Sequence, residues 1–415
     1  MRVLLLNDFA AVRGGSDQVA IAEARGLAAR GHDVTFWTAV GPVDPSLKDV
    51  PRLAVCCLGS QDILQDPQRL RAIRRGIWNG DAAAQLARWI NRRDLSGWVG
   101  HVHGWSKALS ASIFPVLRKA GLDPIITLHD YFAVCPNGTF HDHQRNEPCL
   151  RRPLGAACLT THCDSRAYSH KLWRVLRHSV QKFGAGVPSE VRHVISLSAH
   201  SEEVIQPNLN RTVKIHRLGN PVEVVRRPRV QAEHNRAITY IGRLAQEKGV
   251  LDLAKAVGNG FKGDWPVVFA GAGDLRPKLL QLAPGAIVTG WLDRSGVDEV
   301  LQRARVVVCP SVCHETYGLS AAEARARGVP VVVSDRCATR EQVRDGIDGW
   351  HFRQGNPESL RTVLKQALND PRLEQISRNA YEHYWSSPSE LTGHLAQLEM
   401  IYAEVLGVQR RAAVA

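Results

Sequence analysis

The chain has 415 residues, 44% of them hydrophobic, and a formal net charge of +13. This length and composition predict two globular domains and exclude a fibrous or largely disordered protein. Asp8 interrupts the apolar start of the chain, and no run approaches the ~20 apolar residues of a membrane span, so we expect a cytoplasmic protein without a signal peptide or transmembrane helix.

The positive charge indicates an anionic partner. A phosphorylated substrate, an acidic membrane surface and nucleic acid would all satisfy it. Nucleic acid is disfavoured because the sequence contains no zinc-finger, RNP or helix-turn-helix pattern. The expected partner is therefore a phosphorylated small molecule or a bilayer.

Short apolar runs alternate with helical stretches along the whole chain, which predicts two doubly wound α/β units. Buried parallel strands are continuous and rich in Val and Ile. The runs predicted as strands of the first unit are residues 3–6, 34–37, 99–103, 124–128, 193–197 and 213–218. Those of the second unit are residues 237–241, 266–270, 286–289, 306–309 and 329–334. The polar, proline-interrupted stretch 219–235 predicts the linker between them.

A glycine pair follows the first predicted strand. Gly14 and Gly15 carry no side chain, so their N–H groups can approach phosphate oxygens closely. Ser16 and Asp17 are placed to cap a helix over residues 18–29. No Gly-x-Gly-x-x-Gly follows this strand, which disfavours a dinucleotide-binding protein.

Two further strands of the first unit end in histidine. His103 ends the run 99–103, and His129 with Asp130 follows the run 124–128 directly. Ligands of open α/β sheets bind at the carboxyl ends of the strands. We therefore expect these side chains to face a cleft.

A cysteine-rich insertion of about 135–165 follows His129 and Asp130. It contains Cys135, Cys149, Cys158 and Cys163. The segment is long and poor in apolar residues, so an interaction other than apolar packing must order it. Four thiolates can bind a structural zinc ion or an iron–sulfur cluster. The histidines available as further ligands are His141, His143 and His162. The spacing matches no standard metal motif, and free thiols and disulfides are the alternatives.

Residues 166–182 contain basic side chains and no acidic one. With Tyr168, Leu172 and Leu176 they can form an amphipathic helix whose cations flank an apolar stripe. An ordinary packed helix with a solvated basic face is the favoured interpretation. The alternative is a helix that holds the protein peripherally on an anionic inner-membrane surface.

The second unit carries two cations and two carboxylates at predicted strand ends. Arg243 and Lys248 lie on the loop after the run 237–241, where both can face a diphosphate. Glu315 lies on the loop after the run 306–309. Glu323 lies in the helix that Gly318 and Leu319 begin, and its carboxylate can accept two hydroxyl donors, as a ribose presents.

These motifs, in this order, resemble the retaining family-four glycosyltransferases of the GT-B fold, the glycosyl transferases group 1. The resemblance rests on Gly14-Gly15, His101-Val-His103, His129-Asp130, Gly242-Arg243 with Glu247-Lys248-Gly249, Gly271-Ala-Gly273, and Glu315-x7-Glu323 in a His-Glu-Thr-Tyr-Gly-Leu setting. It covers most of the chain.

The resemblance implies two Rossmann-like domains that face a cleft: an acceptor domain over residues 1–220, a donor domain over 236–385, and a C-terminal helix within 386–415 that returns to the first domain. The donor would be a nucleotide sugar of the UDP, GDP or ADP type. The acceptor would be a polyprenyl-linked or other glycan, in polysaccharide or glycolipid synthesis. Transfer would need no cofactor.

The resemblance also implies roles for single residues. His129 would contact the donor sugar near the reacting carbon, and Glu315 would position the sugar hydroxyls and not attack. Arg243 and Lys248 would clamp the diphosphate. The other donor-binding residues would be Gly14, Gly15, Gly318, Leu319 and Glu323, and the acceptor side would contain His103 and Asp130.

Two other functions fit parts of the sequence. A nucleotide-sugar epimerase of similar two-domain build would also bind a nucleotide diphosphate, but its reaction would not depend on an acceptor. A non-catalytic, metal-stabilised protein at a membrane surface would use only the cysteine-rich insertion and the basic helix.

Overall fold

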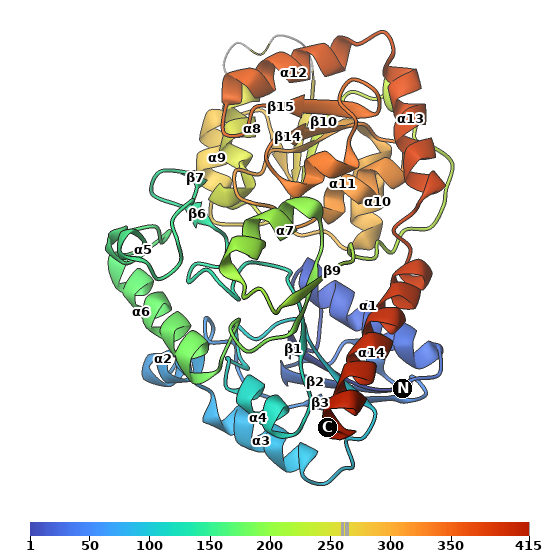
Figure 1. Ribbon diagram of the computed structural model, residues 1–415. Coiled ribbons are helices and arrows are strands. Elements are labelled where there is room, and N and C mark those ends of the chain that lie inside the picture. The colour runs from blue at the N-terminus through green and yellow to red at the C-terminus, as the bar shows by residue number, and fades with distance from the viewer. Residues whose placement is uncertain (259–260, 262–264, 415) are drawn as a thin grey trace.

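The computed structural model of the chain contains two α/β domains, each built around a parallel sheet (Figure 1). It describes residues 1–258, 261 and 265–414. Residues 259–260 and 262–264 of the predicted donor domain, and Ala415 at the end of the predicted C-terminal segment, lie outside the described residues. The predicted doubly wound fold is confirmed.

The first domain contains a seven-stranded sheet of order β3-β2-β1-β4-β5-β8-β9. Its strands are β1 (Arg2–Phe9), β2 (Asp33–Val40), β3 (Leu53–Cys57), β4 (Trp98–Val102), β5 (Ile125–Thr127), β8 (His193–Ser196) and β9 (Lys214–Arg217). In the central strand β1, Leu4 and Leu6 pack on one face and Val3 and Leu5 on the other. Burial on both faces explains the continuous apolar runs. The sequence analysis missed β3, an edge strand of five residues.

The helices of this domain are α1 (Gly15–Ala29), α2 (Arg69–Ile77), α3 (Gly80–Ile90), α4 (Ile113–Lys119), α5 (Ala156–Thr160), α6 (Tyr168–Ser179) and α7 (Ala199–Ile205). α1 begins earlier than predicted, and its N-cap is Gly14, which makes no side-chain cap. The prediction that Ser16 and Asp17 cap this helix was therefore wrong, because both lie inside its first turn. Asp17 instead accepts hydrogen bonds from the Asn7 side chain (2.9 Å) and the Arg13 N–H (3.1 Å).

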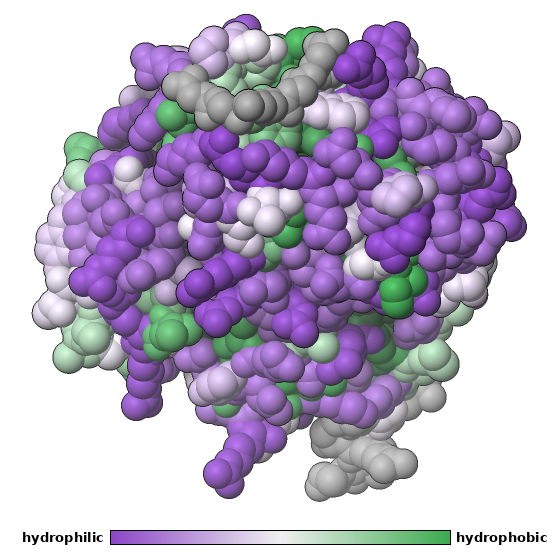
Figure 2. All heavy atoms as spheres, turned by 90° about the horizontal axis from the view of Figure 1, so that it is seen from above, coloured by the Kyte–Doolittle hydropathy of each residue, from purple (hydrophilic) through white to green (hydrophobic). Residues whose placement is uncertain are grey.

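The second domain contains a six-stranded sheet of order β12-β11-β10-β13-β14-β15. Its strands are β10 (Ala237–Ile241), β11 (Val267–Ala270), β12 (Ile287–Val288), β13 (Ala304–Cys309), β14 (Val331–Ser334) and β15 (Gly349–Phe352). Its helices are α8 (Val250–Val257), α9 (Arg276–Leu282), α10 (Arg294–Gln302), α11 (Leu319–Ala326), α12 (Pro357–Asn369) and α13 (Leu373–Ser386). The face that carries α12 is mostly hydrophilic, with small separate apolar spots (Figure 2). The edge strand β15 was not predicted, because its sequence alternates apolar and polar residues.

The last helix, α14 (Leu391–Val414), lies beside α1 of the first domain (Figure 1). Leu395, Leu398 and Tyr402 are buried there, in the same apolar cluster as the outer face of β1. Gly26 of α1 makes the approach close, since a Cβ at this position would lie 2.5 Å from the Leu395 side chain. The chain thus crosses to the second domain and ends on the first.

The loop after β10 requires glycine where it meets the end of β13. Gly249 has φ +67° and follows the 3-10 turn Gln246–Lys248. A Cβ there would lie 1.8 Å from the carbonyl oxygen of Pro310. A side chain at Gly249 would therefore push apart the two loops that carry Lys248 and Glu315.

We expect Gly249→Ala to lower the melting temperature more than Gly290→Ala. Gly290 also has positive φ (+80°), but a Cβ there meets no atom within 4 Å. Gly290→Ala should cost only the left-handed backbone penalty, about 1–2 kcal/mol, whereas Gly249→Ala adds the clash with Pro310. Thermal unfolding of both variants checks this, and equal losses would contradict the close contact.

Candidate active site

Two helix N-termini meet where the domains face each other. Gly15 begins α1 and Leu319 begins α11, and a Cβ on Gly15 would lie 2.8 Å from the Leu319 side chain. The N-cap residues are Gly14 and Gly318, and a glycine has no side chain that could accept a hydrogen bond. The first N–H groups of both helices are therefore not capped by a side chain. Unpaired N–H groups and the positive ends of two helix dipoles make this a site for an anion.

Lys248 and Glu315 form an ion pair beside this point. The ammonium donates to both carboxylate oxygens, at 2.9 and 2.6 Å, and the Ser311 hydroxyl donates to one of them at 2.9 Å. Burial alone would raise the pKa of Glu315, but Lys248 and the Ser311 hydrogen bond lower it below its usual range. Both groups are therefore charged. The structure thus brings together one cation and one carboxylate that the sequence analysis had placed on separate loops.

Arg243 lies on the same loop as Lys248 but is more exposed. Its guanidinium pairs with Glu247 at 3.0 Å, and its side chain is 70% exposed. The carbonyl of Glu247 accepts the N–H groups of Val312 (3.0 Å) and Cys313 (3.2 Å). These backbone bonds hold the loop of the two cations against the loop of Glu315.

Glu323 lies in α11 and stays without a hydrogen-bond partner among the described residues. Burial raises the pKa of its carboxyl to about 7, and Arg294 lowers it only in part. A partly buried carboxylate without a donor is costly for the free protein. A ligand with two hydroxyl groups would supply the missing donors.

His129 faces the Glu315 loop from the first domain. Its carbonyl accepts from the Thr316 hydroxyl (3.0 Å), and its Nε2 lies 3.0 Å from Nδ1 of His103. Burial lowers the pKa of His129 to about 3, so the ring is neutral near neutral pH. The Asp130 carboxylate accepts the Phe132 N–H (2.8 Å) and thereby holds the turn after β5.

Of the further histidines at the domain interface, His200 and His314 were not predicted as site residues, and His141 and His143 were predicted only as available metal ligands. Nε2 of His200, in α7, lies 3.0 Å from Nδ1 of His314, the residue before Glu315. His141 is buried in the hairpin β6 (His141–Asp142) and β7 (Glu147–Pro148), and neither of its ring nitrogens has a hydrogen-bond partner among the described residues. The carbonyl of His143 accepts from Gln246 at 2.9 Å. The cysteine-rich insertion therefore touches the cation loop, a contact for which no local sequence signal exists.

The four cysteines of this insertion are free thiols. The buried Lys171 ammonium donates to Cys158 Sγ (3.4 Å) and Cys163 Sγ (3.1 Å). Within the described ranges, no three of the four sulfurs lie within 4.8 Å of one another. The Lys171 ammonium thus occupies the space between the sulfurs of Cys158 and Cys163. The metal site of Cys135, Cys149, Cys158 and Cys163 stays a prediction.

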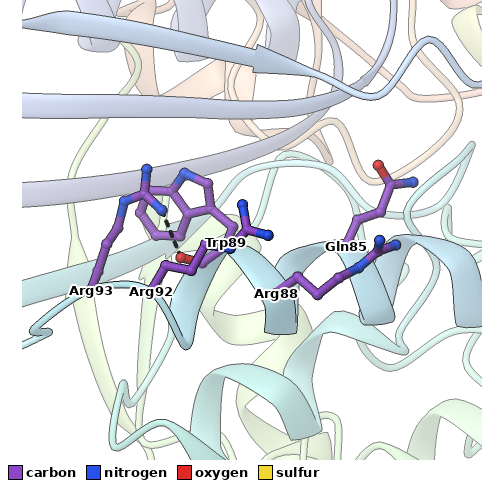
Figure 3. A pocket seen from close by; sticks show the side chains of 5 residues that line it. All are labelled: Gln85, Arg88, Trp89, Arg92 and Arg93. Atoms are coloured by element: carbon purple, nitrogen blue, oxygen red, sulfur yellow. Dashed lines mark hydrogen bonds between the residues drawn. The ribbon is translucent and has the colours of Figure 1, made fainter.

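A cavity of about 520 Å³ lies elsewhere, along α3 of the first domain (Figure 3). It is lined by Gln85, Arg88, Trp89, Arg92 and Arg93. The Arg93 guanidinium stacks over the Trp89 ring at 4.1 Å and donates to the Trp89 carbonyl at 2.7 Å. None of the predicted site residues lines this cavity, so we place the candidate active site at the domain interface.

Comparison with known sequences finds its family match in the second domain. The family described as glycosyl transferases group 1 matches residues 223–383. An uncharacterized glycosyltransferase of Methanocaldococcus jannaschii is 29% identical over 181 residues, 40% of this chain and 46% of the relative. A phosphatidyl-myo-inositol mannosyltransferase of Propionibacterium freudenreichii is 29% identical over 184 residues, 41% of this chain and 47% of the relative. The matched segment spans less than half of either relative.

Comparison with solved structures covers both domains. The HepE protein of Anabaena, solved in complex with UDP and glucose, aligns with a TM-score of 0.66 and 15% identity over 97% of this chain and 100% of its own. At this identity the likeness establishes the GT-B fold alone.

We expect Glu323→Gln to stabilise the ligand-free protein at pH 8 and not at pH 5. The pKa of Glu323 is raised in the folded state, to about 7, so the folded protein binds this proton more tightly than the unfolded chain. The contribution of Glu323 to the unfolding free energy therefore falls as the pH rises above the pKa that Glu323 has in the unfolded chain, and it levels off above pH about 7. Each ~1 kcal/mol recovered should raise the melting temperature by roughly 2–4 °C.

Thermal melts across this pH range check the expectation. Glu358→Gln is the control, because that side chain is 80% exposed in the same domain. A Glu323→Gln effect that does not grow between pH 5 and 8 would show that the carboxyl is not desolvated.

Proposed function

Because residues 223–383 belong to the glycosyl transferases group 1 and the chain has the GT-B fold, we propose that the protein transfers a sugar from a nucleotide diphosphate to a hydroxyl acceptor with retention of configuration. The observation that carries this proposal is the Lys248–Glu315 pair beside the facing N-termini of α1 and α11. This arrangement suits a donor with a diphosphate and a sugar.

Breaking the sugar–phosphate bond leaves negative charge on the diphosphate. The N–H groups at Gly15 and Leu319 and the Lys248 ammonium stabilise that charge, and Arg243 lies on the same loop. Fixed donors that need no reorganisation lower the barrier most. Glu323 accepts the ribose hydroxyls of the nucleotide.

Glu315 positions the sugar hydroxyls and does not attack the anomeric carbon. Both of its oxygens already accept from Lys248, which makes the carboxylate a poor nucleophile. The acceptor hydroxyl then attacks from the face that the diphosphate leaves, and a phosphate oxygen of the donor takes its proton. Neutral His129 contacts the sugar from the acceptor domain.

The site and the relatives support a choice of donor and acceptor classes. UDP is bound in the HepE structure, and the Propionibacterium freudenreichii relative is named as a mannosyltransferase of phosphatidyl-myo-inositol. We therefore place the reaction in polysaccharide or glycolipid synthesis, with a UDP-, GDP- or ADP-sugar as donor and a polyprenyl-linked or other glycan as acceptor. The insertion that carries His141 borders the acceptor side.

Titration with UDP, GDP and ADP in buffer containing a chelator tests the donor site. We expect one nucleotide to bind, and Lys248→Ala to weaken it about 10- to 100-fold, since a charged hydrogen bond contributes about 1.5–3 kcal/mol. Lys255→Ala is the matched control, because Lys255 is 52% exposed on the next helix, α8. If none of the three nucleotides binds, the transferase proposal fails. Turnover of the bound nucleotide sugar without an acceptor would favour an epimerase.

We also propose that the first domain rests on an anionic bilayer. Its exposed apolar face consists of Leu70 and Ile73 on α2, Leu172 and Leu176 on α6, and Phe183 just after α6; Leu70 is 79% and Phe183 78% exposed. α2 and α6 pack side by side (Figure 1). Burying apolar side chains of this size is favourable in a bilayer interface.

The charges around this face support an anionic lipid partner. α2 carries Arg69, Arg74 and Arg75, and neither α2 nor α6 contains an acidic residue. Lys182 lies beside Phe183. In the described parts of the chain, every helix is too short or too polar to cross a membrane. The proposed contact is therefore peripheral, through the first domain and not through the hydrophilic face of Figure 2.

Sedimentation with vesicles tests this contact. We expect binding to vesicles that contain an anionic phospholipid, weaker binding in high salt, and none to vesicles of neutral phospholipid. Phe183→Glu should weaken binding about tenfold or more, because burying a Phe side chain contributes about 1.5–3 kcal/mol. Trp291→Glu, at a side chain that is 73% exposed on the second domain, should change nothing. Equal effects of the two changes would contradict the assignment of this face.

A further inference from the structure

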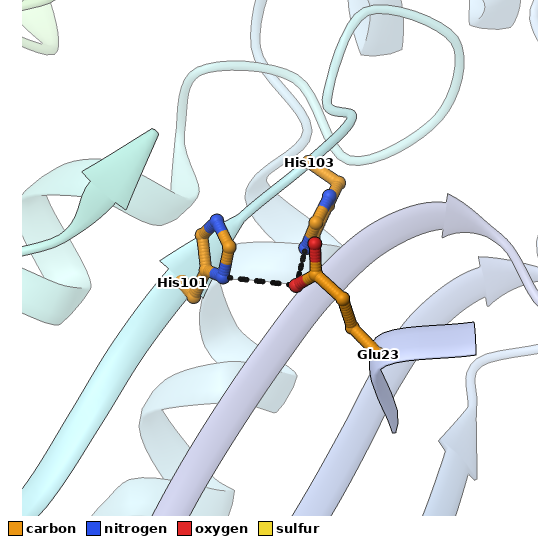
Figure 4. Close-up of side chains that lie close together, drawn as sticks. All are labelled: Glu23, His101 and His103. Atoms are coloured by element: carbon orange, nitrogen blue, oxygen red, sulfur yellow. Dashed lines mark ion pairs between the residues drawn. The ribbon is translucent and has the colours of Figure 1, made fainter. Parts of the chain in front are cut away.

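A carboxylate is buried beneath the candidate active site, and the proposed function does not yet use it. Glu23 of α1 is 1% exposed and points toward His101 and His103 at the end of β4 (Figure 4). Its Oε2 lies 3.2 Å from Nε2 of His103 and 3.5 Å from Nδ1 of His101. Its Oε1 lies 3.0 Å from Nε2 of His394, on α14. A buried carboxylate of this kind must be paired.

The hydrogen-bond partners of His394 determine its charge. Nε2 faces the Glu23 carboxylate, and Nδ1 lies 2.9 Å from the carbonyl oxygen of Gly219. Both partners can only accept, so both ring nitrogens must carry a proton. His394 is therefore the cation that balances Glu23, and it reaches the first domain only because α14 crosses back.

His101 supplies no second charge. Its Nδ1 lies 2.7 Å from the Tyr402 hydroxyl and its Nε2 lies 2.7 Å from the Thr127 hydroxyl. Burial lowers the pKa of His101 well below its usual value. The ring is neutral and fully engaged. His103 is therefore the histidine that interacts with the remaining oxygen of Glu23, Oε2.

The proton of His103 can then be placed. Nε2 of His103 and Oε2 of Glu23 are both buried, and neither forms a hydrogen bond of good geometry within the described residues, although the two atoms lie 3.2 Å apart, within ion-pair distance. A proton on Nε2 lets this nitrogen face the carboxylate. With Glu23 already balanced by His394, His103 is neutral and its Nδ1 carries a lone pair.

This state of His103 determines the tautomer of His129. Nδ1 of His103 lies 3.0 Å from Nε2 of His129, and only one of these two nitrogens can hold the shared proton. Because the His103 nitrogen is an acceptor, the proton belongs to Nε2 of His129. Within the described chain, Nδ1 of His129 has no hydrogen-bond partner.

We propose that Glu23 is a positioning residue that acts through His103 to keep the proton of His129 on Nε2, so that Nδ1 is presented to the substrate as a hydrogen-bond acceptor. The role in catalysis rests on the proposed transferase function; the tautomer itself does not. The acceptor nitrogen suits a sugar hydroxyl, which must donate to it. The C-terminal helix takes part, because His394 keeps the charge of Glu23 balanced.

The experiment compares wild type with Glu23→Gln by nitrogen NMR of isotope-labelled histidine, in the ligand-free protein. In wild type we expect His129 to be protonated on Nε2 alone. The amide that Glu23→Gln introduces can donate to Nε2 of His103, which moves the His103 proton to Nδ1 and the His129 proton to its own Nδ1. We therefore expect the His129 tautomer to invert. The His129 signals are assigned with His129→Gln.

Kinetics provide the second readout. Glu23→Gln should lower kcat roughly 10- to 100-fold, by analogy with residues that orient metal-ligating histidines, with KM for the nucleotide sugar changed less than about threefold. His394→Gln, which touches neither His103 nor His129, should leave Glu23 unbalanced, move a proton to His103 and lower kcat likewise. This variant keeps the proposal testable if Glu23→Gln does not fold.

Tyr402→Phe is the matched control. It removes a hydroxyl from the same buried network and the same helix, but that hydroxyl bonds His101 and not the chain to His129. We expect the His129 tautomer and kcat to stay as in wild type, even if the melting temperature falls.

Three results would overturn the proposal. One is a wild-type His129 protonated on Nδ1, and another is a tautomer unchanged in Glu23→Gln. The third is one equivalent of zinc in the purified protein that Glu23→Gln removes, since the metal would occupy Nε2 of His103. If the tautomer behaves as expected but no nucleotide sugar is used, the transferase function fails and the tautomer assignment stands.

Discussion

The facing N-termini of α1 and α11 are the constraint on which the rest of the site depends. Each helix follows the carboxyl end of a parallel strand, so each presents unpaired N–H groups toward the other domain. Two positive helix ends this close repel each other unless an anion lies between them. Gly15 permits the approach because a Cβ at this position would lie 2.8 Å from the Leu319 side chain. The two domains therefore meet in a way that favours a negatively charged ligand.

Two of the buried charges around this point are balanced by a partner, and the Glu323 carboxylate is not. Lys248 is balanced by Glu315, and Glu23 by His394 on the returning helix. Glu323 has no such partner within the described chain. Burial of its charged form without a partner is unfavourable, and its pKa is raised for that reason. The balanced pairs hold fixed geometry, whereas the unbalanced carboxylate leaves hydrogen-bonding capacity for a ligand.

Much of the fold could be predicted from the sequence, because strands buried on both faces must be continuously apolar. The run at residues 306–309 is an example, and it forms most of β13. The edge strand β15 was missed because Gly-Trp-His-Phe is not a continuous apolar run, whereas β3 was missed although Leu53–Cys57 is continuously apolar. Arg243, Lys248 and Glu315 were predicted as donor-side residues because they lie on loops after predicted strands, and Glu323 because it lies near the start of the helix that follows. Their roles remain proposals.

The sequence alone determined the two α/β domains, the order of the motifs and the loops on which the charged residues lie, since these depend on local patterns of burial and on chain order. Only the tertiary structure decided which of these groups meet. The contact of Glu23 with His394 joins positions 371 residues apart, and no periodicity links them. The placement of Lys171 between Cys158 and Cys163 could not be predicted from the sequence either. Such contacts depend on how the domains and the last helix pack, and packing is a property of the whole chain.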